Sequence, residues 1–477
     1  MKHLVVALLL VWCRGADCDE EKLPNIVFIL TDDQDTELGG MVPMTKTKEL
    51  IGKQGIVYEN MFVSSPLCCP SRSSIFSGKY VHNHGALNNS LEGGCSDATW
   101  QQREEPNAFP ALLKRYGFPK AGGVAHIPPG WDWWYGLVGN SKYYNYQVSV
   151  NGTMEKHGHV YAKDYFTNYI NEKAMQFLET RKEGGGPFFM MMATPACHGP
   201  FTPADIYNNS FPNERAPRNG SYNVKPKDKH WLIQQTIVPL PSDTVTSDDN
   251  VFRNRWRTLL SVDDMVENVV NILQQKNLLE DTYIFFSSDN GFHLGQFGLP
   301  SDKRQLYEFD IRVPLMARGP GIKPGQVSKS VPQPVDGKPL QATWSARDPG
   351  QNEAADPFRS TVLVEHSGEH AVIVKGCPRY DGQGMANCNP HCVCEDSWNN
   401  TYNCMRTTLD QLVYKFCVIK ETPEFVEMYN MTVDPYEFTN IANTADPTLV
   451  QSLRDDLDRL IRCSGSSCSN GGKNTQT

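Results

Sequence analysis

Short, continuous runs of apolar residues recur along the chain, and polar residues follow each of them. The runs and the residues that follow are 26–30 before Asp32 and Asp33, 187–194 before His198, 282–288 before Asp289 and Asn290, and 313–317 before Arg318. Runs of this kind are typical of strands that are buried on both faces of a sheet. We therefore expect at least four core strands with polar segments at their carboxyl ends.

Helical periodicity separates these predicted strands. The segment 252–276 has apolar residues near helical spacing, at Leu259, Leu260, Val262, Val266, Val269, Val270 and Leu273, and we interpret them as core positions. Strands that alternate with helices predict an α/β fold with a large, mainly parallel sheet flanked by helices. After Val327 the composition changes, and strands at 360–364, 371–375 and 414–419 with a helix at 447–463 predict a smaller C-terminal α+β subdomain.

The chain ends divide the sequence further. Lys2, the apolar run 4–12 and the small residues Gly15 and Ala16 predict a signal peptide over 1–16. The run is shorter than the roughly 20 residues that cross a bilayer, and no later stretch reaches that length, so we expect no membrane span. The remaining divisions are a catalytic domain at 17–335, a C-terminal subdomain at 336–463 and a flexible tail at 464–477. We expect a soluble protein, lysosomal or secreted.

Cysteine usage and glycosylation motifs fit that compartment. The chain has 14 cysteines. Without Cys13, which lies in the predicted leader, and Cys68, which belongs to a motif discussed below, an even number remains for disulfide pairing. Cys392 and Cys394 could bind zinc, but a secreted chain favours disulfides, whose connectivity stays open. Six Asn-x-Ser/Thr motifs predict N-glycosylation, at Asn88, Asn151, Asn208, Asn219, Asn399 and Asn430.

The overall charge restricts the class of partner. The formal net charge is −9 and the pI is about 5.8, so we expect no nucleic-acid partner. A polyanionic substrate would have to bind a local basic pocket rather than a global positive field. The 12 histidines would gain charge at mildly acidic pH and reduce this conflict.

Two of the predicted strand ends supply oxygen ligands. In open parallel sheets the functional site lies beyond the carboxyl ends of the strands. Asp32 and Asp33 would repel each other there unless a cation lay between them, and Asp289 and Asn290 add two further oxygen groups. The set suits calcium or magnesium rather than zinc. An ordinary acidic turn is the alternative at each position.

The segment 64–79 contains the most specific motif of the chain. Its core is Cys68-Cys69-Pro70-Ser71-Arg72, followed by Ser77-Gly78-Lys79, and the pattern predicts the start of an amphipathic helix. A thiol there would feel the helix dipole and the guanidinium of Arg72, which favour an anionic or polar reactive form. A buried cysteine pair beside a cap is the alternative. The whole string resembles the signature of the sulfatases, in which the first cysteine is oxidised to formylglycine.

This resemblance extends over nearly the whole mature chain. It implies an alkaline-phosphatase-like fold, one Ca²⁺, a formylglycine derived from Cys68 and not from Cys69, and a formylglycine-generating enzyme as a partner. It implies these roles: Asp32, Asp33, Asp289, Asn290 and modified Cys68 as calcium ligands, Cys68 as nucleophile, Arg72 holding the aldehyde hydrate, His198 protonating the departing sugar oxygen, and Lys303 neutralising sulfate. His82, His84 and His293 lie next to motifs, either as pocket-lining or as structural residues.

Further strings resemble one branch of the family. They are 141–146, 193–198, 260–264, 302–310 and 392–396, and they are similar to members that remove 6-O-sulfate from N-acetylglucosamine units of heparan or keratan sulfate. A phosphatase or phosphodiesterase of the same general fold is a second enzyme hypothesis. It would need Ser or Thr as its nucleophile, and Cys68-x-Pro70-Ser71-Arg72 argues against it.

Two segments depart from the family pattern. At 117–126 the chain lacks a Gly-Lys-Tyr string, whose lysine binds sulfate in the family. At 331–337 it lacks a helical segment that the family has, and these residues join the flanking parts directly. Lys120 does not match the missing lysine. These departures motivate an alternative hypothesis, a catalytically impaired, glycan-binding relative or a splice form that lacks a sulfate-binding segment.

Overall fold

The computed structural model describes residues 23–114, 126–218, 220–333, 360–369, 385–388 and 394–469. Several predictions fall outside these ranges and stay predictions. They are the signal peptide, the shortened segment around 117–126, the strand at 371–375, the motif at Asn219, the boundary at 335/336 and most of the C-terminal tail.

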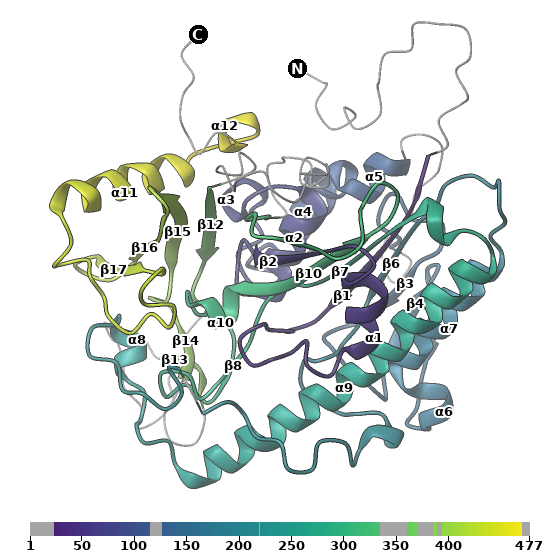
Figure 1. Ribbon diagram of the computed structural model, residues 1–477, viewed down its shortest axis with the longest axis horizontal. Coiled ribbons are helices and arrows are strands. Elements are labelled where there is room, and N and C mark those ends of the chain that lie inside the picture. Colours follow the sequence, from purple (N-terminus) through teal and green to yellow (C-terminus); the bar gives the residue numbers. More distant parts are fainter. Residues whose placement is uncertain are drawn as a thin grey trace, which may run out of the picture.

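A six-stranded mixed sheet forms the centre of the larger unit (Figure 1). In spatial order its strands are β11 (Gln326–Ser328), β2 (Ile56–Phe62), β10 (Arg312–Arg318), β7 (Thr282–Ser288), β1 (Asn25–Thr31) and β6 (Phe189–Ala193). Three of the five pairings are parallel, and β1 pairs with β6 and β7 in parallel register. The four predicted core strands are therefore confirmed as β1, β6, β7 and β10.

The direction of β10 corrects one expectation. Because β10 runs antiparallel to both of its neighbours, its carboxyl end at Arg318 lies at the sheet edge opposite to the ends of β1, β6 and β7. The polar residues after β10 therefore do not join the other three sets. The amino end of β10 lies at the same edge as those three ends, and the strand begins two residues after Asp310.

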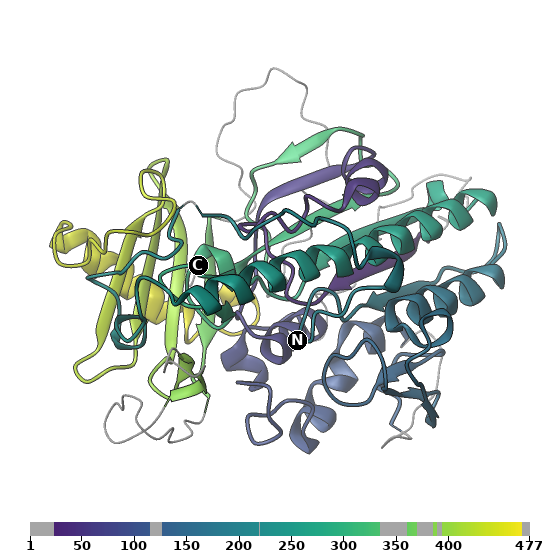
Figure 2. The same ribbon diagram turned by 90° about the horizontal axis from the view of Figure 1, so that it is seen from below.

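Helices cover one face of the sheet with a continuous apolar core. α7 (Phe166–Glu179) packs against the long helix α9 (Ser242–Gln275), and both lie along the strands in Figure 2. Val262, Val266 and Val269 of α9 are fully buried and share this core with Val27 and Ile29 of β1. The core positions predicted within 252–276 are confirmed for these residues, but the helix begins ten residues earlier than predicted.

The other face of the sheet is covered by short helices and by the C-terminal unit. The short helices are α2 (Cys68–Ser77), α3 (Val81–His84), α4 (Ala98–Arg103) and α5 (Phe109–Lys114). The C-terminal unit is an antiparallel sheet of β12 (Thr361–His366), β15 (Tyr402–Leu409), β16 (Leu412–Ile419) and β17 (Phe425–Asn430), with α11 (Pro447–Leu460) packed on it. The smaller α+β unit is thus confirmed, although β15 was not predicted.

The remaining elements are short. They are α1 (Thr45–Thr47), β3 (Tyr135–Leu137), β4 (Gln147–Val150), β5 (Thr153–Lys156), α6 (Tyr161–Asp164), α8 (Trp231–Gln234), β8 (His293–Leu294), β9 (Ser301–Asp302), α10 (Glu308–Ile311), β13 (Met385–Cys388), β14 (Cys394–Ser397) and α12 (Ser466–Ser469). Among the described residues, no helix is long and apolar enough to span a bilayer.

Disulfides connect cysteines that are close in sequence. The pairs are Cys69–Cys95, Cys404–Cys417 and Cys463–Cys468, and Cys394 is also disulfide-bonded, which favours the disulfide hypothesis over zinc at this position. Among the described cysteines, Cys68 and Cys197 have free thiols. The even count suggested that every cysteine other than Cys13 and Cys68 forms a disulfide, and the free thiol of Cys197 departs from that expectation. Asn399 is fully buried, so glycosylation at this motif is incompatible with the fold.

Candidate active site

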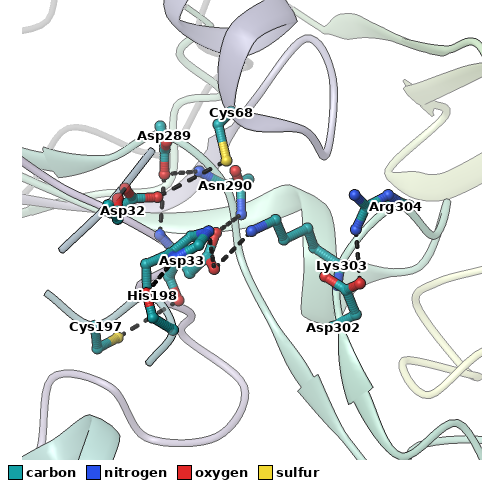
Figure 3. A network of polar contacts seen from close by, with 12 residues as sticks. Asp32, Asp33, Cys68, Cys197, His198, Asp289, Asn290, Asp302, Lys303 and Arg304 are labelled. Carbon is teal, nitrogen blue, oxygen red and sulfur yellow. Dashed lines mark hydrogen bonds and ion pairs between the residues drawn. The ribbon is translucent and has the colours of Figure 1, made fainter. Parts of the chain in front are cut away.

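The parallel ends of β1 and β7 bring four oxygen-bearing side chains together. Thr31 pairs with Ser288 in the register of the two strands, so the residues that follow them meet at one edge of the sheet. The backbone N–H of Asp33 donates to Asp289 Oδ1 at 3.0 Å, and Asn290 Nδ2 donates to Asp33 Oδ1 at 2.7 Å (Figure 3). The structure therefore brings together the residues that follow these two strands, as the sequence predicted.

Helix α2 presents Cys68 and Arg72 to the same cluster. Cys68 Sγ lies 3.8 Å from Asp32 Oδ1. Arg72 Nε donates to Asp289 Oδ2 at 2.7 Å, and its Nη2 lies 3.2 Å from Asp32 Oδ2. One guanidinium therefore joins the carboxylates that follow β1 and β7.

The packing of α2 differs from the predicted amphipathic helix. Its buried residues are Pro70, Ser71, Ser73 and Ser74. Ser71 Oγ donates to the backbone carbonyl of Asp289, and Ser64 Oγ donates to Ser74 Oγ. The helix is held by hydrogen bonds from small polar side chains rather than by an apolar stripe, because it packs against the polar end of the sheet.

Burial determines the charge state of the cysteine thiol. Burial raises the pKa of Cys68 well above its usual value, and the carboxylates of Asp32, Asp289 and Asp33 add to this against the opposing charge of Lys303. The unmodified thiol is therefore neutral, and the anionic form that the sequence suggested is not favoured. Burial and the three carboxylates act in the same direction, against ionisation.

The carboxylates of the cluster differ in their affinity for protons. Burial raises the pKa of Asp289 to about 6, although Arg72 opposes the shift. For Asp33, burial raises the pKa, but the positive charges of Lys303 and His198 outweigh it and bring the pKa well below its usual value. In the absence of a cation, Asp289 therefore binds a proton more readily than Asp33 does.

The donor set fits a hard cation. Asn290 Oδ1 is buried and has no hydrogen-bond partner, which leaves one amide oxygen available. Ligand atoms of Asp32, Asp33, Cys68 and His198 all lie within 4.8 Å of one another. A divalent cation among these oxygens would offset the repulsion between the carboxylates and supply a partner for the orphaned oxygen. An oxygen replacing Sγ of Cys68 would complete an oxygen-rich set.

His198 and Lys303 approach the cluster from two further loops. Lys303 is buried and its Nζ donates to Asp33 Oδ2 at 2.7 Å. His198 Nε2 lies 3.8 Å from the same oxygen, while its Nδ1 lies 2.8 Å from the carbonyl of Gly199. Because a carbonyl only accepts, Nδ1 bears the proton and Nε2 faces the site. All the site residues predicted from sequence are thus neighbours; Figure 3 labels each of them except Arg72, whose contacts are given above.

Three further residues contact the cluster and were not predicted. Ser141 Oγ donates to Asp32 Oδ2 at 2.6 Å, and Arg255 and Asp35 form a buried pair behind Asp33. Ser141 lies in the string 141–146 that carried the resemblance, which was the available signal. No sequence pattern distinguished Arg255, because it occupies one position in the middle of a long helix.

Two of the three histidines next to the motifs have structural roles. His293 is fully buried between Asp310 and Glu395, whose charges outweigh burial and raise its pKa to about 10. His82 Nδ1 lies 2.9 Å from both carboxylate oxygens of Glu365. His84 is buried between α2 and the following loop. The structural alternative therefore holds for His293 and His84.

His84 should make stability sensitive to acid. Its Nδ1 accepts from the N–H of Ala86, so protonation would remove that bond, and burial together with the charges of Lys79 and His82 lowers its pKa to about 3. The unfolded chain binds the proton near pH 6.5, so stability falls as the pH drops below that value, by about 2 kcal/mol at pH 5. We expect His84→Gln to reduce the loss between pH 7 and pH 5 by that amount in urea titrations. An unchanged pH dependence would contradict this assignment.

Comparisons with known proteins agree with this geometry. Residues 24–339 match the family described as Sulfatase. The chain is 46% identical to the N-acetylglucosamine-6-sulfatase of Homo sapiens, over 94% of this chain and 86% of the relative. It is also 46% identical to the N-acetylglucosamine-6-sulfatase of Capra hircus, over 93% of this chain and 84% of the relative.

A solved structure with the same fold was determined in complex with its substrate, D-glucosamine-2-N,6-O-disulfate. The TM-score is 0.69 at 22% identity, and the match covers 95% of this chain and 99% of the other. At that identity the likeness establishes the fold.

Proposed function

The chain belongs to the sulfatase family and is a sulfuric ester hydrolase, and we propose that it removes 6-O-sulfate from N-acetylglucosamine 6-sulfate units of glycosaminoglycans such as heparan or keratan sulfate. The observation that supports this most directly is the position of Cys68. It starts a helix that faces a buried cluster of carboxylates, with Lys303 and His198 on the opposite side. Relatives that cover most of the chain at 46% identity bear the name of this activity.

We propose that Cys68 is converted to formylglycine, as in the family. When hydrated, the aldehyde supplies two hydroxyl groups on one carbon, so one oxygen can attack sulfur and the other can later expel sulfate. Cys69 is not available for this role because it is bonded to Cys95. Arg72 lies one helical turn after Cys68 and would hold the hydrate against the cluster.

The residues that would hold a divalent cation are Asp32, Asp33, Asp289, Asn290 and the oxygen at position 68. We propose calcium, because the donors of this set are carboxylate, amide and hydroxyl oxygens, which hard cations prefer. His198 lies near the set, and we assign it a different role below. Such a cation would lower the pKa of the attacking hydroxyl and neutralise sulfate oxygens. Lys303, whose Nζ contacts the proposed ligand Asp33, would add a second positive charge that stabilises the sulfate oxygens.

His198 is proposed as the acid that protonates the departing sugar oxygen. Its Nδ1 is fixed by the carbonyl of Gly199, so Nε2 is the atom that can exchange a proton with a substrate. An alcohol leaving group needs this proton because a free alkoxide is a poor leaving group. A phenolate leaves readily without it.

Replacement of His198 should therefore depend on the leaving group. His198→Ala is expected to lower kcat for N-acetylglucosamine 6-sulfate by about 10²–10⁴-fold, and to lower kcat for an aryl sulfate such as 4-nitrophenyl sulfate much less. Sulfate release and nitrophenolate absorbance provide the two rates. His159→Ala, which changes an exposed histidine, is the control. Equal losses on both substrates would remove the acid role from His198.

The proposed substrate is tested by incubating the purified, secreted protein with N-acetylglucosamine 6-sulfate and measuring free sulfate. The matched control is N-acetylglucosamine 6-phosphate, which distinguishes the sulfatase from a phosphatase of similar fold. We expect sulfate release and no comparable phosphate release. No release of sulfate would favour the alternative of an impaired, glycan-binding relative.

Lysosomal or extracellular location, N-glycosylation outside Asn399 and modification by a formylglycine-generating enzyme complete the proposal. The disulfides within 69–95, 404–417 and 463–468 fit an oxidising compartment. We also propose the catalytic domain at 17–335 and the C-terminal subdomain at 336–463 as the two units of the chain.

A further inference from the structure

We propose that Arg255 is a positioning residue that holds two loops of the site, the loop after β1 and the loop before His198, in their working geometry. This inference rests on the proposed function, because it concerns the same site. Arg255 belongs to the middle of α9 and is 2% exposed. It lies beneath the cluster and contacts no position open to a substrate, so it acts only through other residues.

The guanidinium of Arg255 connects three segments that follow different strands. Its Nη2 donates to the backbone carbonyl of Asp33 at 2.7 Å and to Asp35 Oδ1 at 2.6 Å. Its Nη1 is 3.4 Å from the carbonyl of Cys197, and its Cζ lies over the Phe292 ring, 3.9 Å from the ring centre. Residues from the ends of β1, β6 and β7 therefore share one planar cation.

The backbone of Asp33 needs such support. Its φ is +60°, in the left-handed region that residues with a Cβ adopt at a cost. The carboxylate of Asp33 receives Lys303 Nζ and Asn290 Nδ2 and lies near His198 Nε2. A rotation of this one residue would displace a proposed metal ligand and the contacts of the two residues that face the substrate.

The second loop is bound to the first at the same place. The N–H of Cys197 donates to the carbonyl of Asp32 at 2.6 Å, and the N–H of Asp32 donates to the carbonyl of Ala196 at 2.8 Å. Arg255 adds its bonds at the carbonyls of Asp33 and Cys197, so it completes a network across both loops. His198 directly follows Cys197 and takes its position from this network.

A lysine cannot replace this arrangement, although it preserves the charge. A single ammonium could pair with Asp35, but it lacks the several N–H groups by which the guanidinium reaches two loops. It also lacks the planar group that lies over the Phe292 ring. Arg255→Lys should therefore fold and keep the buried charge paired, while the carbonyls of Asp33 and Cys197 lose their donor.

The test compares Arg255→Lys with Arg257→Lys in the full-length, secreted protein. Arg257 is two residues along the same helix, and it donates to the carbonyl of Ser210 and to Asn254 Oδ1, away from the site. For Arg255→Lys we expect faster hydrogen–deuterium exchange in peptides covering 30–36 and 195–200 only. We also expect a calcium Kd about tenfold higher by calorimetry and a kcat lower by about 100-fold. Arg257→Lys should change none of these.

The outcomes separate this inference from the proposed function. Wild-type exchange in both loops with an unchanged kcat, or an increase confined to one loop, would overturn the inference. Faster exchange in both loops would support it even if the wild type released no sulfate, in which case the proposed function alone would fail. If Arg255→Lys does not fold, Phe292→Leu decides, because it removes the ring beneath the guanidinium and leaves the hydrogen-bonding groups of Arg255 in place. Faster exchange in the same two peptides supports the inference, and no change overturns it.

Discussion

Replacement of Cys68 with alanine is expected to abolish sulfate release, with a loss of at least about 10⁴-fold in kcat, because removing a covalent nucleophile leaves only binding and charge stabilisation. The structure gives the reason that an unmodified thiol would not suffice. The pKa of the Cys68 thiol is raised by burial and by the surrounding carboxylates, so a thiolate is not available at neutral or acidic pH. We therefore expect activity to require the proposed formylglycine at this position.

Mass spectrometry of the peptide that contains residues 68–72 tests the chemistry directly. We expect formylglycine at position 68 in protein from a cell that makes the modifying enzyme, and a disulfide between Cys69 and Cys95 in the same sample. Cys68→Ser made in that cell serves as the matched control, because it retains a hydroxyl but not the aldehyde. Full activity with an unmodified Cys68, or modification at Cys69, would contradict the assignment.

Asp32→Ala is expected to remove both calcium binding and activity. Asp32 contributes one of three carboxylates in the cluster, and a six- to eight-oxygen shell cannot be completed without it. Its loss also leaves Ser141 Oγ and Arg72 Nη2 without this partner. Calcium at about 100 times its Kd should stabilise the wild type by roughly 2.7 kcal/mol.

The measurement is thermal unfolding with and without calcium, together with calorimetric titration. The wild type should show a higher Tm with calcium, and Asp32→Ala should show none of this shift. Asp205→Ala, at a short helix outside the cluster, is the control for a general effect of lost negative charge. Equal calcium affinity in Asp32→Ala and the wild type would show that the metal site is elsewhere.

Sequence alone predicted the strands that form the site, because each strand is marked by its own run of apolar residues. β1, β6 and β7 are apolar runs that end in polar residues, and parallel neighbours place those ends on one edge. β10 has the same local pattern, but it runs in the opposite direction. Strand direction depends on how the chain returns to the sheet, which a single run cannot show.

The motif at Cys68 and the oxygen residues were identified by residue type and spacing, since their chemistry belongs to the side chains themselves. The protonation state of Cys68 was not, because it depends on burial and on carboxylates that the fold brings near, from Asp32 and Asp33 after β1 and from Asp289 after β7. The polar packing of α2 has the same origin, as its serines contact Asp289 and other buried groups that only the fold brings near.

What the sequence by itself determined is the set of chemical groups, the alternation of strands and helices, and the family to which they belong. Only the tertiary structure decided which groups meet and in what charge state. Arg255 is the clearest case, since an arginine in a helix has no local sign of function. Its guanidinium becomes important because three loops converge on it. Hydrogen bonds and charge interactions act through short distances in space, and local sequence patterns carry little information about those distances.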